Sequence, residues 1–259
     1  MLVVFLSMII LILISFITAS YLIFYISFEI VFIFIFFFLI TWGVTPERLQ
    51  ASFYMFFYTL IFSLPFLLLL VKYLDYFVMT SFVLFYFSFE GLIFIFMIFI
   101  FVVKLPLYGF HLWLPKAHVE SPVRGSILLA GVLLKLGGYG LLRFLPSILL
   151  LSFSSSLFIG FIFYLALIGG VYASFLCVRQ IDLKIMIAYS SVVHIRIGYL
   201  GLVVFTLRGS LGAILIIVSH GFISPLLFYL INEIYARLSS RRLLILKGFL
   251  ISRPLFCFF

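Results

Sequence analysis

The first 41 residues of the chain contain a single charged side chain, Glu29, among long runs of Phe, Ile and Leu. A helix needs about 20 apolar residues to cross the roughly 30 Å hydrocarbon layer of a bilayer, so this stretch is long enough for two crossings. The rest of the 259 residues is similar, with 67% hydrophobic and only 9% charged residues, whereas soluble domains have about 25% charged residues. A soluble globule could not bury so many apolar side chains. The composition therefore predicts an all-α polytopic membrane protein and excludes soluble enzymes, nucleic-acid-binding modules and secreted disulfide scaffolds.

The apolar stretches predict about eight membrane spans within one membrane domain, 1–259. They lie near 1–18, 21–41, 51–71, 83–105, 123–145, 155–177, 184–205 and 209–235. The fourth span leads into an irregular stretch that reaches Glu120, and a basic tail occupies 236–259.

The basic residues support this count, because they gather on one side of the expected membrane. One set of loops, together with the tail, holds Arg48, Lys116, Arg124, Arg179, Lys184, Arg237, Arg241, Arg242, Lys247 and Arg253. The opposite side holds only Lys72, Arg143 and Arg208. Such a bias places the basic side in the cytoplasm or, in an organelle, in the matrix. We expect the carboxyl terminus on that side and the amino terminus on the other.

Among the charged side chains within the expected spans, four call for an explanation: Glu29, Lys104, Lys135 and Arg196. A charge at the bilayer centre costs roughly 2.5–3.5 kcal/mol on insertion scales, so each needs a partner or a function. The alternative without a functional role is a charged side chain near the end of a helix that reaches the membrane interface. Lys104 is followed by Pro106, which lacks a backbone N–H and predicts a helix broken near 104–118. Broken helices with ionisable residues at the break are typical of ion-translocating membrane proteins.

The remaining titratable candidates are four histidines, His111, His118, His194 and His220. A single buried histidine is more often structural, but together with Glu29, Lys104 and Lys135 these residues form a row along which protons can move. We expect a Glu29–Lys104 ion pair to act as its gate, because a nearby carboxylate favours the protonated lysine. The sequence has no dinucleotide or phosphate-binding loop and no CxxC, and Cys177 and Cys257 lack metal-ligand spacing. We therefore expect no cofactor or metal on this chain.

The run KLPLYGFHLWLPKAHVESPVRGSILLAGVLLKLGGYGLLR, residues 104–143, is long and specific. It resembles the chain 4 family of mitochondrial NADH:ubiquinone oxidoreductase (complex I), and shorter matches extend the resemblance over most of 22–250. Bacterial counterparts and multisubunit cation/proton antiporters are similar. The resemblance implies a proton-translocating subunit of the H⁺-translocating NADH:ubiquinone reductase in the mitochondrial inner membrane. NADH, FMN, iron–sulfur clusters and ubiquinone are then expected on other subunits.

The family has two inverted repeats, each with a broken helix, and a polar axis at the membrane midplane. The resemblance places a first-repeat core at 21–145 and further spans at 155–235. It assigns Glu29 and Lys104 to the coupling pair, Lys135 to the central lysine, and the four histidines to the axis. The implied partners are other membrane-arm subunits and membrane lipids, including cardiolipin.

Three departures from the family pattern leave other interpretations open. Relative to the family, the chain lacks leading spans and stops before the second broken helix, so the second repeat is incomplete. Either a separate chain supplies the missing helices, or the subunit has been reduced to a scaffold. Arg196 also stands two residues after His194, where small or apolar residues are usual. The alternatives are a component of a cation/proton antiporter, or a reduced structural membrane-arm subunit that no longer pumps.

Overall fold

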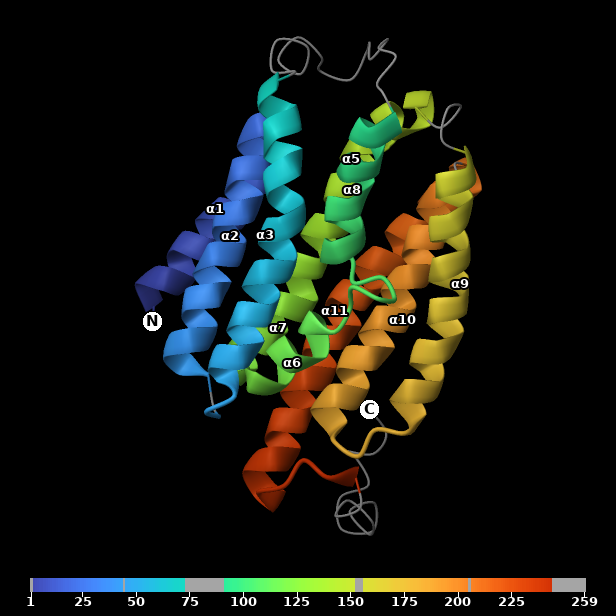
Figure 1. Ribbon diagram of the computed structural model, residues 1–259. Coiled ribbons are helices and arrows are strands. Elements are labelled where there is room, and N and C mark those ends of the chain that lie inside the picture. Colours follow the sequence, from blue (N-terminus) through green and yellow to red (C-terminus); the bar gives the residue numbers. More distant parts are fainter. Residues whose placement is uncertain (1, 44, 73–90, 152–155, 205, 244–259) are drawn as a thin grey trace.

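A computed structural model describes the chain except for residues 1, 44, 73–90, 152–155, 205 and 244–259 (Figure 1). The described residues form helices joined by short connections, as expected, with one isolated β-bridge between Asp182 and Arg242. The helices are α1 (Leu2–Ile17), α2 (Tyr21–Trp42), α3 (Arg48–Lys72), α5 (Gly91–Lys104), α6 (Trp113–Glu120), α7 (Val123–Leu128), the π-helix η1 (Leu129–Leu133), α8 (Leu134–Leu151), α9 (Ser156–Val178), α10 (Leu183–Val203) and α11 (Leu207–Leu238).

Six helical stretches among the described residues are long and apolar enough to cross a membrane. They are Tyr21–Trp42, Arg48–Val71, Val123–Phe144, Gly160–Val178, Leu183–Val203 and Leu207–Leu238. The first expected span corresponds to α1, which has only 16 residues, and the fourth to α5, with 14 described residues. The beginning of the fourth expected span, near residue 83, lies outside the described residues. Six of the eight expected spans are therefore long enough to be recognised, and the count of eight is not confirmed.

The helices form a bundle in which α5 and α8 lie between two groups (Figure 1). Helices α1, α2 and α3 pack in sequence on one side, while α9, α10 and α11 pack together on the other. Aromatic rings fill the centre: the Phe144 ring of α8 lies 5.3 Å from Phe66 of α3 and 5.5 Å from Phe101 of α5. This packing places α5 against α3 and α8, and α6 against α3 and α10. The candidate site lies where α5 ends, among these helices.

The expected direction of the first helix was wrong. Arg143, on the sparsely charged side, donates a hydrogen bond to the backbone carbonyl of Ala19 in the turn between α1 and α2. That turn therefore lies at the Arg143 end of the bundle, and α1 begins toward the basic end, where α11 finishes (Figure 1). An even number of crossings returns the chain to the side from which it started, so eight spans would also have placed both termini together. Lys247 and Arg253 of the basic tail lie outside the described residues.

Helices α10 and α11 approach so closely at one point that only glycine fits. A Cβ atom at Gly209 would lie 2.6 Å from the carbonyl oxygen of Gly201, and one at Gly201 would lie 2.8 Å from the carbonyl oxygen of Gly209. At Gly212, three residues later in α11, an added Cβ atom would have no neighbouring atom within 4 Å. Small residues at such crossings allow helices in membranes to pack by close backbone contact.

We expect Gly209→Ala to destabilise the α10–α11 pair by about 1–3 kcal/mol, because the new methyl group must displace backbone. Gly212→Ala is the matched control, and it should leave stability unchanged or raise it by up to about 1 kcal/mol through helix propensity. The measurement is the thermal unfolding of the detergent-solubilised assembly that contains each variant. Equal unfolding temperatures for the two variants would contradict the close approach.

Candidate functional site

The site is built around the predicted break in the fourth helix. Helix α5 ends at Lys104, and the next helical segment, α6, begins at Trp113. Pro106 lies two residues after the end of α5, where its missing N–H cannot continue the helical hydrogen bonds. The indole Nε1 of the fully buried Trp113 donates a hydrogen bond of 3.2 Å to the carbonyl of Val103, which the break leaves free. The break therefore places Lys104 at the end of a helix, inside the bundle.

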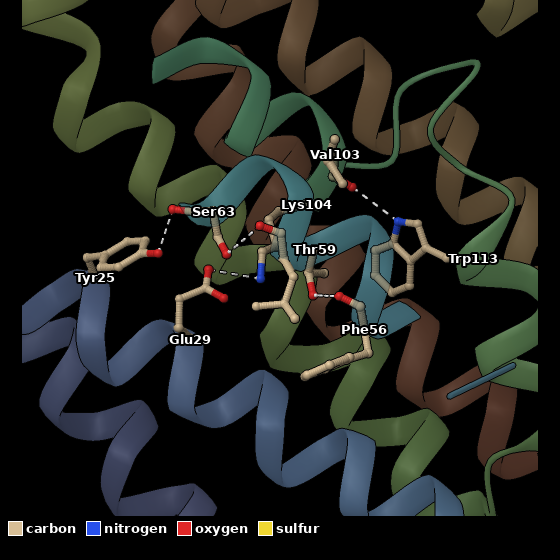
Figure 2. A network of polar contacts seen from close by, with 9 residues as sticks. Tyr25, Glu29, Phe56, Thr59, Ser63, Val103, Lys104 and Trp113 are labelled. Carbon is tan, nitrogen blue, oxygen red and sulfur yellow. Dashed lines mark hydrogen bonds and ion pairs between the residues drawn. The ribbon is translucent and has the colours of Figure 1, made fainter. Parts of the chain in front are cut away.

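Glu29 and Lys104 form the ion pair that the sequence predicted. Lys104 Nζ lies 3.2 Å from Glu29 Oε1, with the lysine 1% and the glutamate 16% exposed. Figure 2 shows the two side chains pointing toward one another from α2 and the end of α5, beside α3. The ammonium group also lies 3.2 Å from the ring centroid of Phe32 and 4.6 Å from that of Phe28. A carboxylate and two aromatic faces thus stabilise a charge that has lost its water.

Helix α8 packs against the break and carries the second lysine. A Cβ atom at Gly137 would lie 3.4 Å from Lys104 Cβ, so the two helices are in contact next to the ion pair. Lys135 stands two residues earlier in α8 and faces α11, where its Nζ lies 2.8 Å from Nδ1 of His220. The His220 ring is 6.0 Å from that of His194 on α10. The structure therefore joins Lys135, His220 and His194 in a second cluster.

The π-helix η1 was not predicted. Residues Leu129–Leu133 form one wide turn directly before α8, and Lys135 Nζ donates a hydrogen bond to the carbonyl of Ala130 within it. The Ser224 hydroxyl of α11 lies 3.4 Å from the same carbonyl and donates to the carbonyl of His220 at 2.7 Å. Single π-turns occur frequently at functional sites because they free backbone groups inside a helix. A wide turn of this kind gives no periodicity signal, so the sequence pattern could not have located it.

Lys135 borders a cavity of about 400 Å³ between η1 and α11. Gly131, Gly221 and Pro225 are among its lining residues. His194, at the end of the cluster, is exposed on α10. The second cluster is therefore open to the outside of the described part of the chain, whereas the Glu29–Lys104 pair is enclosed.

The other two histidines make no hydrogen bond with the described residues of either cluster, although the charges of Lys135 and His220 act on His118. His118 is fully buried in α6, where its ring stacks on Phe228 of α11 at 4.6 Å. His111 lies in the break, stacked on Tyr108 at 5.1 Å, with the Tyr189 ring 5.9 Å away. None of the ring nitrogens of these two histidines has a hydrogen-bond partner among the described residues. The sequence interpretation named these histidines but not their aromatic neighbours, because ring stacking between distant segments has no sequence signature.

The basic end of the bundle holds polar contacts that the sequence interpretation also missed. The hydroxyl of Thr45 donates to Glu120 Oε2, and Lys184 Nζ donates to the carbonyl of Ser121 at 3.0 Å. Burial, and next the nearby carboxylate of Glu47, raise the pKa of Glu120. These contacts hold the end of α6 against the loop before α3 and the start of α10. A cavity of about 300 Å³ lies beside them, lined by Glu47, Gln50, Lys116, Glu120, Gln180 and Tyr189, among others.

Comparisons with known proteins place this arrangement in a family. Residues 18–259 match the sequence family described as NADH:quinone oxidoreductase/Mrp antiporter, transmembrane. The NADH-ubiquinone oxidoreductase chain 4 of Locusta migratoria is 48% identical over 219 residues, which cover 82% of this chain and 48% of the relative. That of Artemia franciscana is 41% identical over 253 residues, which cover 97% of this chain and 64% of the relative. The chain thus spans about half to two thirds of the length of these relatives.

Solved structures show the same fold. A chain of the structure of respiratory complex I from Thermus thermophilus with bound NADH matches with a TM-score of 0.76 and 24% identity, over 88% of this chain and 50% of that chain. A chain of the membrane-bound sulfane sulfur reductase, an archaeal respiratory membrane complex, matches with a TM-score of 0.80 and 20% identity, over 93% and 51%.

The broken helix, the buried carboxylate–lysine pair and the second lysine together define an antiporter-like membrane subunit, a multi-pass protein. The chain belongs to the NADH:quinone oxidoreductase/Mrp antiporter membrane family. Within that family, relatives that are 41–49% identical over most of this chain are named NADH-ubiquinone oxidoreductase chain 4.

Proposed function

We propose that the chain translocates protons as a membrane-arm subunit of respiratory complex I in the mitochondrial inner membrane. It couples NADH-to-ubiquinone electron transfer, carried out by cofactors on other subunits, to proton movement through its own side chains. Its partners are the other membrane-arm subunits and membrane lipids, cardiolipin among them. The names of the relatives support the assignment to the complex.

One observation carries the proposal: two groups of titratable side chains lie at membrane depth and are linked by α8. The first is the enclosed Glu29–Lys104 pair, and the second is the open cluster of Lys135, His220 and His194. Charged groups in this environment are costly unless they are used. A proton held by Lys104 while Glu29 is near can leave when the carboxylate moves, and Lys135 can then receive it. The hydrogen bond from Lys135 to His220 continues the path toward the exposed His194, and His118 is a further candidate member of the row.

The test is Lys135→Met in the assembled complex. We expect proton uptake per electron to fall tenfold or more, because methionine has a similar length and no proton to transfer. Lys116→Met is the matched control: Lys116 is an exposed lysine of α6 at the basic end, and its loss should leave proton uptake unchanged. Unchanged pumping in Lys135→Met would favour the reduced structural subunit instead.

The antiporter alternative is tested by isolation. Co-purification of the chain with quinone-reducing NADH dehydrogenase activity is expected for a complex I subunit. Its isolation with an assembly that exchanges cations for protons, without NADH oxidation, would assign it to a cation/proton antiporter. The isolated chain should oxidise no NADH in either case.

A further inference from the structure

Arg196 is a buried positive charge that the proposed proton path does not use. It lies within α10, is 1% exposed, and none of its three guanidinium nitrogens has a hydrogen-bond acceptor among the described residues. An arginine side chain stays ionised in proteins. A permanent charge at this depth is expensive, so its position calls for a physical explanation.

The guanidinium group lies against the broken helix. Its central carbon is 5.4 Å from the ring centroid of Tyr108, which belongs to the segment between α5 and α6. Gly169 of α9 closes the other side: a Cβ atom there would lie 2.1 Å from Tyr108 Cβ and 3.0 Å from Arg196 Nη1. Because Gly169 has no side chain, Arg196 and Tyr108 can occupy the space next to it.

The same tyrosine ring also contacts His111. The two rings stack at 5.1 Å with an interplanar angle of 22°, and His111 is 3% exposed. The Tyr189 ring of α10 lies 5.9 Å from the His111 ring, and the Tyr172 ring of α9 lies 5.2 Å from the Tyr108 ring. Among the described side chains, no carboxylate forms an ion pair with either Arg196 or His111. His111 thus has a fixed positive charge nearby and no paired negative charge to offset it.

We propose that Arg196 is a positioning residue whose fixed charge keeps excess protons off His111, so that transfer between the Glu29–Lys104 pair and Lys135 bypasses that histidine. Burial alone disfavours the imidazolium form, and the like charge adds to this effect. Both groups lie against Tyr108, so they are no more than about 11 Å apart, and at an effective dielectric constant of about 20 the repulsion lowers the protonated fraction roughly tenfold. The inference rests on the proposed function, because it concerns the route of the same protons.

The experiment compares five forms of the chain in the assembled complex: native, His111→Gln, Arg196→Met, Arg196→Lys, and the double variant His111→Gln with Arg196→Met. Glutamine keeps a polar side chain at 111 but does not titrate, and lysine keeps the charge at 196. Proton uptake per electron is measured from pH 5 to pH 8. We expect native, His111→Gln and Arg196→Lys to give the same profile. Arg196→Met should gain a pH-dependent step in proton uptake that the native complex lacks, and the double variant should lose that step.

Two outcomes would overturn the inference. A severalfold loss of pumping in His111→Gln would show that protons use His111 despite Arg196, and this single variant remains informative even if Arg196→Met fails to assemble. A profile of Arg196→Met identical to the native one would show that the charge does not act on His111. Either result leaves the proposed function intact, since that function depends on the native complex pumping and on Lys135.

Discussion

Glu29→Gln is expected to abolish proton pumping by the assembled complex. The substitution preserves the shape of the side chain but removes the carboxylate that lies 3.2 Å from Lys104 Nζ. Without it, the lysine loses the attraction that distinguishes its proton-holding state from its proton-releasing state. Lys104→Ala should have the same effect on pumping, because it removes the proton carrier itself. Both are measured as proton uptake per electron in sealed vesicles.

Assembly and pumping can be separated with a double variant. Removing one partner of a buried pair leaves an uncompensated charge, which costs about 3–5 kcal/mol, so each single variant is expected to lower the amount of assembled complex. Glu29→Gln combined with Lys104→Met removes both charges and should restore assembly without restoring pumping. Pumping that recovers with assembly, or that persists in Glu29→Gln, would reject the ion pair as a gate.

Trp113→Ala is expected to have the largest effect on stability. The side chain is fully buried at the start of α6, and truncation of a buried tryptophan costs about 3–5 kcal/mol. Trp113→Phe keeps most of the volume but leaves the Val103 carbonyl without its donor, at a cost of about 1–3 kcal/mol. The measurement is thermal unfolding of the detergent-solubilised complex.

Trp42 provides the matched control for these two variants. It is a partly buried residue at the end of α2, where its ring packs on Phe38 at 5.2 Å, and it has no hydrogen bond corresponding to that of Trp113 among the described residues. Trp42→Phe should change the unfolding temperature little. If Trp113→Phe were as stable as Trp42→Phe, the indole hydrogen bond would not hold the break together.

Several features followed directly from local chemistry in the sequence. Pro106 cannot continue a helix hydrogen-bond pattern, so the end of α5 at Lys104 could be predicted within one residue. The pairing of Glu29 with Lys104 could be predicted because each charge is too costly to stand alone in an apolar span. The closeness of α10 and α11 at Gly201 and Gly209 was not predicted, since glycines also occur at positions such as Gly212 that contact nothing.

The sequence by itself determined that the chain is a helical membrane protein, where its fourth helix breaks, and which side chains carry costly charges. These properties depend on composition, on the proline ring and on the free-energy cost of burying a charge, and each of these acts within a few residues. Only the tertiary structure decided that Lys135 meets His220 through a π-turn, that His118 stacks on Phe228, and that Arg196 shares the Tyr108 ring with His111. Such contacts depend on the rotation and crossing of whole helices, which many distant side chains set together.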